Sequence, residues 1–193
     1  MTITKLELKR KLIHLGSLVI PIGYVFVSKD GAMIPLLAVT AFFLFFDLVR
    51  HHSQTIRLIY EKHLIGSVIR QRERNRLVGA TYLMIGACLC VWFLDKPIAI
   101  VSLHVLIVSD TLAALVGNTF GRTPLFGTKT LEGSMAFFLS GLVIVLFYPR
   151  VPPLLGVAGV CVATLVELLP LRVDDNLLIP LAMGFTIQGL AVL

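Results

Sequence analysis

The sequence predicts an all-α polytopic membrane protein, a bundle of about seven transmembrane helices that forms a single domain over residues 1–193. Of its residues, 57% are hydrophobic and only 15% are charged, and the mean hydropathy is +0.92. A soluble domain of this length has a far more polar composition. The apolar residues form continuous stretches and do not alternate with polar ones, which favours helices over a β-barrel.

Seven apolar stretches are separated by short polar breaks. Each has roughly the ~17–20 residues that a helix needs to cross the hydrocarbon core. In chain order they are 12–28, 32–49, 77–94, 97–116, 133–148, 151–169 and 177–193. The first stretch follows basic residues, as in a signal peptide, but it shows no clear cleavage pattern and a second stretch follows at once. We therefore expect the first stretch to be retained.

The basic residues predict the orientation of the bundle. With seven spans and a cytoplasmic N-terminus, all but three of the 17 Lys and Arg residues fall on the cytoplasmic side. The three exceptions are Lys29, Lys96 and Arg150. This bias predicts that the N-terminus is cytoplasmic and the C-terminus outside. The net charge of +6 then indicates anionic membrane lipids as partners and gives little reason to expect nucleic acid.

The one long connection, residues 50–76, is predicted to be a cytoplasmic basic amphipathic segment. Leu58, Ile65 and Ile69 share one helical face in it, and "RQRERNR" follows them. A basic helix lying on the membrane surface explains this pattern. A solvated loop that satisfies the positive-inside rule explains it equally well.

Acidic residues gather at the predicted cytoplasmic ends of the last four spans. They are Asp110, Glu132, Glu167, Asp174 and Asp175. Ionisable groups at membrane depth are costly, so they usually face a partner or a water-filled site. Five such groups at three places in the chain predict a functional site on the cytoplasmic face.

The segment "SDTLAALVGNTFGR" ends the fourth span with an acidic and small-residue face. Asp110, Ala113, Ala114 and Gly117 share one side of a helix. Small residues allow another helix to approach closely, so one interpretation is a packing seam. The other is a carboxylate at the head of a wall against which a ligand lies, and the two interpretations are compatible.

The loop that follows, "GNTFGRTPLFGTKTLEGS", combines glycines with Arg122 and Lys129. Glycines let backbone amides approach phosphate oxygens, and the two cations neutralise phosphate charge. The loop therefore predicts a phosphate cradle. Its spacing differs from a Walker A loop, since five residues separate Gly121 from Gly127 and no strand precedes it, which excludes the P-loop fold.

A third polar segment, "VELLPLRVDDNLLIP", places Asp174, Asp175 and Asn176 in the turn before the last span. Paired carboxylates with an amide suit Mg²⁺, a hard cation that takes oxygen ligands and keeps substrate phosphates in its shell. Asp and Asn are also common turn residues. The turn emerges on the same side as the glycine-rich loop, which favours the metal interpretation.

Six motifs in order give the chain a resemblance to a known family. They are "RKLIH" (Arg10, Lys11, His14), "DLVR" (Asp47, Arg50), "GATYLMIG", "SDTLAALVGNTFGR", "GTKTLEGS" and "ELLPLRVDDNLLIP". The ordered set resembles the polyprenol kinase family, which groups dolichol kinase, phytol kinase and CTP-dependent diacylglycerol kinase. The resemblance implies a membrane kinase that transfers the γ-phosphate of CTP to the hydroxyl of a lipid or isoprenoid alcohol, with Mg²⁺, on the cytoplasmic face.

The resemblance also implies roles for individual residues. The catalytic candidates are Asp110, Lys129, Glu132 and Glu167, with Glu132 or Glu167 accepting the proton of the substrate hydroxyl. The nucleotide-binding candidates are Gly117, Asn118, Gly121, Arg122, Lys129, Thr130, Gly133 and Ser134. The metal-binding candidates are Asp110, Asp174, Asp175 and Asn176. No pattern in the chain predicts an oligomeric state.

Two other functions remain open from the sequence. A CTP:phosphatidate cytidylyltransferase has a similar Asp-led helix end and KTxEG loop, but its Gly-His-Gly-Gly signature is missing from the C-terminal region of this chain. A small transporter or membrane scaffold would place charges along a pathway across the bilayer, whereas here they gather at one face.

Overall fold

The computed structural model describes residues 5–52 and 77–192, and they form a bundle of eight helices. The helices are α1 (Lys5–Gly16), α2 (Val19–Phe26), α3 (Lys29–His52), α5 (Gly79–Phe93), α6 (Lys96–Phe120), α7 (Leu131–Leu146), α8 (Pro153–Leu168) and α9 (Asp175–Ala191). Within these residues no strand occurs, and the only β-type pairing is an isolated bridge between Pro124 and Thr130.

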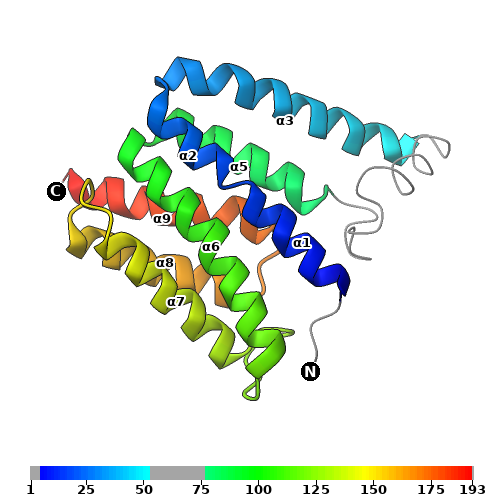
Figure 1. Cartoon of the computed structure of the whole chain (residues 1–193), viewed down its shortest axis with the longest axis vertical. Helices are drawn as coiled ribbons and strands as arrows, with labels where there is room; N and C mark the ends of the chain where they lie inside the picture. Colours follow the sequence, from blue (N-terminus) through cyan, green and yellow to red (C-terminus); the bar gives the residue numbers. More distant parts are fainter. Residues whose placement is uncertain (1–4, 53–76, 193) are drawn as a thin grey trace.

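Helix α6 runs through the middle of the bundle (Figure 1). Helices α7 and α9 pack on one side of it, with α8 packed against those two, and α1, α2 and α5 contact it as well. Helix α3 lies at the outside and packs mainly against α5. The first described residue, Lys5, lies at the opposite end of the bundle from the end of α9 (Figure 1), which is the arrangement that an odd number of spans requires.

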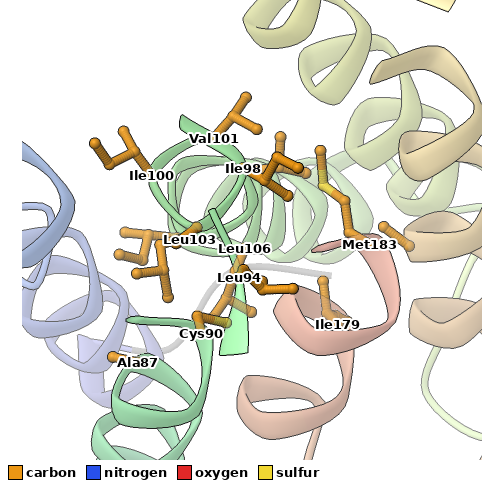
Figure 2. Close-up of a cluster of buried hydrophobic side chains, with 14 of the residues drawn as sticks. Ala87, Cys90, Leu94, Ile98, Ile100, Val101, Leu103, Leu106, Ile179 and Met183 are labelled. Carbon is orange, nitrogen blue, oxygen red and sulfur yellow. The ribbon is translucent and has the colours of Figure 1, made fainter. Parts of the chain in front are cut away.

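The core centres on the first half of α6. Ile100, Leu103 and Leu106 are completely or almost completely buried, and they belong to one cluster of buried side chains with Cys90 of α5 and Met183 of α9 (Figure 2). Within a membrane, helices associate through such close packing, because lipid provides no hydrophobic driving force between them. The residues around 98–107 therefore fix the position of α6.

Small residues allow the outer helices to approach each other. A Cβ atom on Gly159 of α8 would lie 2.7 Å from Cγ1 of Ile187 on α9. Real Cβ contacts are essentially never this short, so glycine is required for the observed separation of the two helices.

Two of the helices are long and apolar enough to cross a membrane, namely Lys29–Arg50 and Lys96–Phe120. The helices Gly79–Phe93, Leu131–Leu146 and Pro153–Leu168 are apolar but shorter. On α3, large side chains such as Phe42 and Phe45 are exposed, at 52% and 60%. The all-helical bundle is thus confirmed for the described residues, and these features indicate association with a membrane.

The first predicted span is not a single helix in the structure. It is divided into α1 and α2 by a turn at residues 17–18, where the Ser17 hydroxyl donates to the carbonyl of His14 at 2.5 Å. Helix α1 also begins at Lys5, well before the apolar stretch. The basic part of α1 packs against α6, and Lys11 in it is only 4% exposed.

Two lysines join helices at the end of the bundle away from Lys5. The ammonium of Lys29 donates to the carbonyl of Trp92 at 2.6 Å. The ammonium of Lys96 donates to the carbonyl of Val27 at 2.8 Å and lies 5.3 Å from the ring centroid of Tyr24. Both cations lie at the C-terminal ends of helices, α5 and α2, where unpaired carbonyls and the helix dipole favour positive charge. These two predicted outer lysines therefore have a structural role.

The predicted amphipathic segment 50–76 lies largely outside the described residues, including Leu58, Ile65 and Ile69. The surface helix remains a prediction, and so does the direction in which the bundle is inserted.

Candidate functional site

Charged side chains from five helices meet at one end of the bundle. They come from α1, the C-terminal half of α6, the loop 121–130 with the start of α7, the end of α8 and the start of α9. Sequence positions as distant as Lys11 and Asp175 thus contribute to the same end, as the sequence predicted for the last four spans.

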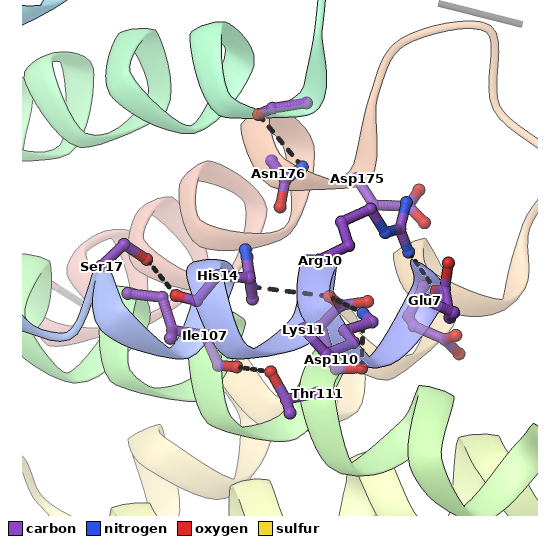
Figure 3. Close-up of polar contacts among 12 residues, drawn as sticks. Glu7, Arg10, Lys11, His14, Ser17, Ile107, Asp110, Thr111, Asp175 and Asn176 are labelled. Carbon is purple, nitrogen blue, oxygen red and sulfur yellow. Dashed lines mark hydrogen bonds and ion pairs between the residues drawn. The ribbon is translucent and has the colours of Figure 1, made fainter. Parts of the chain in front are cut away.

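Asp110 faces helix α1. Its carboxylate accepts a hydrogen bond from the ammonium of Lys11 at 2.5 Å, and Lys11 also donates to the backbone carbonyl of Asp110 at 3.0 Å. His14 Nε2 lies 3.5 Å from the same carboxylate oxygen. Figure 3 shows both α1 side chains directed at Asp110. The "RKLIH" motif therefore docks α1 onto α6, while Arg10 pairs with Glu7 within α1.

Lys129 joins the loop to two helices that are distant in the sequence. Its ammonium donates to Oε1 of Glu167 at 2.6 Å and to Oδ2 of Asp175 at 3.0 Å. Glu167 is only 3% exposed, and its second oxygen accepts a hydrogen bond from the Ser134 hydroxyl at 3.0 Å. Four of the predicted residues are thus brought together by direct contacts.

The electrostatics of this cluster hold Lys129 in its charged form. Burial alone lowers the pKa of Lys129, but the carboxylates of Asp175 and Glu167 outweigh it and raise the pKa above its usual value. Asp110 contributes to the rise in the pKa of Lys129 as well. The Asp110 cluster on α1 and α6 and the Lys129 cluster on α7, α8 and α9 therefore act on each other electrostatically.

The loop before α7 is a tight hairpin. The Leu125 amide donates to the Lys129 carbonyl at 2.9 Å, and Gly127 takes a positive φ of 58° that favours glycine. Thr130 caps α7, since its hydroxyl accepts from the Gly133 amide at 3.2 Å. The hairpin and the cap together fix the backbone from which Lys129 extends.

Glu132 closes the base of this hairpin. Its carboxylate accepts from the Thr123 amide at 3.2 Å and from the Thr123 hydroxyl at 3.1 Å. Of the other nucleotide-binding candidates, Asn118 lies half-buried in the last turns of α6, and Arg122 is exposed at the start of the loop. Glu132 and Arg122 therefore lie at the rim of the cluster, and Glu167 lies inside it.

The small-residue face of α6 packs against the start of α7. A Cβ atom on Gly133 would lie 2.9 Å from the carbonyl oxygen of Ala113, and one on Gly117 would lie 3.1 Å from the Thr130 hydroxyl. A Cβ atom on Gly121 would lie 2.7 Å from Cγ2 of Thr130. The packing-seam interpretation is confirmed for Ala113 and Gly117. These contacts account for three of the glycines, and the phosphate cradle remains a prediction.

The turn before α9 is built by two of its three polar residues. Oδ1 of Asp174 accepts a hydrogen bond from the backbone amide of Asn176 at 3.1 Å and another from the Asn176 side-chain amide at 2.8 Å. Asp174 thereby caps the N-terminus of α9. The Asn176 side chain also donates to the carbonyl of Gly79 at 3.2 Å, and this contact joins α9 to α5. Asp174 and Asn176 thus have turn and capping roles, and Asp175 is the residue directed at Lys129.

The predicted metal ligands do not form a compact group. Among residues 5–52 and 77–192, no three His, Cys, Asp or Glu side chains stand close enough together to hold a metal ion. The donor chemistry nevertheless fits magnesium, because Mg²⁺ is commonly held by one or two carboxylates and by substrate phosphates. Glu167 and Asp175 are the pair that meets this description, since both approach the same ammonium.

Asp47 and Arg50 belong to a separate structural cluster. Asp47 is fully buried and accepts from Arg50 Nε at 2.6 Å, from the Val78 amide at 2.8 Å and from the Thr81 hydroxyl at 2.6 Å. It therefore caps α5 from the end of α3. The sequence did not indicate that Thr81 and Val78 are its partners, because the contact spans more than 30 residues of chain.

Similar proteins provide the remaining evidence. The chain is 34% identical to an uncharacterised protein of Rickettsia prowazekii, over 91% of this chain and 90% of that protein. It is 30% identical to CTP-dependent diacylglycerol kinase 1 of Eremothecium gossypii, over 73% of this chain and 45% of the kinase. It is also 30% identical to the probable chloroplastic phytol kinase 1 of Oryza sativa subsp. japonica, over 91% of this chain and 62% of that protein.

The alignments with the kinases include most of this chain but only part of each longer kinase. The chain spans about half the length of the curated diacylglycerol kinases it matches. No family model and no solved structure matches the chain. The ordered motifs and these relatives agree, and the chain belongs to the polyprenol kinase family of lipid kinases, the family of its phytol kinase and CTP-dependent diacylglycerol kinase relatives.

Proposed function

We propose that this protein is a multi-pass membrane kinase that transfers the γ-phosphate of CTP to the hydroxyl of a lipid or isoprenoid alcohol. The acceptor is of the phytol, polyprenol or diacylglycerol type. In this proposal the bundle spans the membrane seven times, with α1 and α2 sharing the first span. The charged end faces the cytoplasm.

The observation that supports the proposal most directly is the contact of Lys129 with Glu167 and Asp175 beside Asp110. Phosphoryl transfer depends mainly on alignment and on neutralisation of charge in a loose transition state. A half-buried cation and several carboxylates at the end of an apolar bundle supply these features. They also lie where a water-soluble nucleotide and a lipid hydroxyl can meet.

The charged residues of the cluster then have roles in binding or in proton transfer. Lys129 and Arg122 offset phosphate charge. The Gly121 amide already donates to the Gly117 carbonyl, and the Gly133 amide to the Thr130 hydroxyl, so these two cations carry the phosphate binding in this proposal. Magnesium, when bound, neutralises the charge that develops on the transferred phosphoryl group. Asp175 and Glu167 would hold it, with Asp110 close by.

The substrate hydroxyl loses its proton to a carboxylate of this end of the bundle. The candidates are Glu132, at the rim of the cluster, and Glu167, inside it. Because the transition state is loose, the proton leaves late, so the acceptor contributes less than charge neutralisation does. The two candidates differ in exposure, and the variants Glu132→Gln and Glu167→Gln separate them.

The test is a product analysis on the purified full chain in phosphatidylcholine nanodiscs. The reaction contains Mg²⁺, γ-labelled CTP or ATP, and phytol, farnesol, polyprenol or diacylglycerol in turn. The proposal predicts label in the lipid product and release of CDP. In a parallel reaction with phosphatidate as the substrate, release of diphosphate with formation of CDP-diacylglycerol would instead show a cytidylyltransferase.

A transport assay covers the non-enzymatic alternative. A transporter would take up a labelled solute into proteoliposomes, would do so equally well in the Asp175→Asn variant, and would phosphorylate no lipid. Loss of phosphorylation in Asp175→Asn, with no solute uptake in either protein, is the result that the kinase proposal expects.

A further inference from the structure

Lys129 occupies a position between two carboxylates that come from different helices. Its ammonium lies 2.6 Å from Oε1 of Glu167 and 3.0 Å from Oδ2 of Asp175. Glu167 is held independently of Lys129, because Ser134 donates to its other oxygen. The two carboxylates are thus arranged around one positive charge.

The three side chains differ in how freely they can move. Glu167 lies in the last turn of α8 and is 3% exposed, whereas Asp175 begins α9 and its side chain is 30% exposed. Lys129 extends from the hairpin, and its side chain is 28% exposed. A lysine is a compact charge on a flexible four-carbon stem, so it can change partners while the shorter carboxylates stay in place.

Charge balance limits what Lys129 can do when a nucleotide arrives. If Lys129 stayed between the carboxylates, the phosphates would meet Glu167, Asp175 and Asp110 with little compensation. If Lys129 left to pair with the phosphates and nothing replaced it, the buried Glu167 would keep an uncompensated charge, which is strongly unfavourable.

We propose that Lys129 is a place-holding cation. In the nucleotide-free protein its ammonium fills the cation position between Glu167 and Asp175. When the nucleotide binds, Lys129 turns to the phosphates and leaves both carboxylates to the divalent cation that the nucleotide carries. This inference rests on the proposed function for the identity of the ligand, and it makes Lys129 an inhibitor of premature metal binding.

The test measures metal binding without nucleotide and without turnover. The full chain is placed in phosphatidylcholine nanodiscs, whose lipid carries no net charge, and Mn²⁺ alone is titrated while the free ion is followed by electron paramagnetic resonance. Lys129→Met should bind Mn²⁺ at least tenfold more tightly than the wild type, because the cation position becomes vacant. Lys129→Met with Asp175→Asn should lose this gain.

Lys9→Met is the matched control. Lys9 lies on α1 and is exposed. Its replacement by Met changes charge and shape in the same way as Lys129→Met does. It should bind Mn²⁺ as the wild type does. Equal binding by Lys9→Met and Lys129→Met would show a general effect of net charge and would overturn the proposal, as would no gain in Lys129→Met.

A stability measurement covers the case in which Lys129→Met folds poorly. Without its cation, the pair of carboxylates should lower the unfolding temperature, and millimolar Mg²⁺ should restore it in Lys129→Met but leave Lys9→Met and the wild type unchanged. Failure of Mg²⁺ to restore the variant would contradict the proposal. These readouts use no lipid alcohol, so they can succeed or fail separately from the kinase assay.

Discussion

Lys11 and Asp110, 99 residues apart in the chain, form a direct ion pair of 2.5 Å between α1 and α6. Both side chains are largely shielded, with 5% of Lys11 and 19% of Asp110 exposed. Because the pair brings α1 to the charged end of the bundle, its two members should depend on each other for stability.

Lys11→Met and Asp110→Asn should each destabilise the bundle, by about 3–5 kcal/mol if the pair behaves as a buried one, because each leaves the other group without its partner. The double variant should be more stable than the sum of the single effects predicts. Thermal unfolding in lipid nanodiscs measures this. Strict additivity of the two changes would show that the pair contributes no coupling.

Replacing Asp175 by Asn should reduce turnover at least about 100-fold while the bundle stays folded, because the change removes one of the two carboxylates proposed to hold magnesium beside the phosphates. Steady-state kinetics of lipid phosphorylation measure the loss. Asp30→Asn is the matched control, since Asp30 is exposed at the other end of the bundle, at the start of α3. Equal activity of the two variants would remove Asp175 from the proposed site.

Gly133→Ala should displace the start of α7 from α6 and destabilise the protein by about 1–3 kcal/mol. The added Cβ would lie 2.9 Å from the Ala113 carbonyl oxygen, which is backbone and cannot move aside easily. Gly23→Ala provides the comparison, because a Cβ on Gly23 of α2 meets nothing within 4 Å. That change should be neutral or slightly stabilising, since alanine favours a helix more than glycine does.

Asp47→Ala should lower stability by about 3 kcal/mol or more, because it leaves the Thr81 hydroxyl, the Val78 amide and the Arg50 guanidinium without this buried partner. The KM for nucleotide in the remaining folded protein should be unchanged, because Asp47 lies outside the Lys129 cluster. Val39→Ala, on the exposed face of α3, should alter neither quantity. A raised KM in Asp47→Ala would place this residue nearer to the site than its contacts indicate.

The sequence predicted the helices well because continuous apolar stretches determine them almost alone. It also predicted that Glu167 and Asp175 lie at the same end of the bundle, since topology places them there. It did not predict that Lys129 joins them, because nothing in the spacing of the three segments indicates which side chains touch. The sequence offered a packing seam at Gly117 but did not indicate Thr130 as its partner, since a glycine required for close packing and a glycine required for a phosphate look the same in a sequence.

The division of the first predicted span into two helices shows a second limit of prediction from the sequence. Composition places the boundary of the first span where the apolar residues begin, at position 12, yet α1 begins at Lys5. The partner of this basic part is Asp110, and it lies in another span. A contact between distant segments holds this basic part of α1 against α6, and local patterns contain no information on such a contact.

The two ends of the chain are therefore not equivalent as points of attachment. Helix α1 begins beside the charged cluster, whereas α9 ends at the opposite end of the bundle (Figure 1). A fusion partner or affinity tag at the N-terminal end would lie on the side of the contact between Lys11 and Asp110 and of the proposed nucleotide site. The same addition at the C-terminal end would lie away from both, so purification and labelling of this protein should use that end.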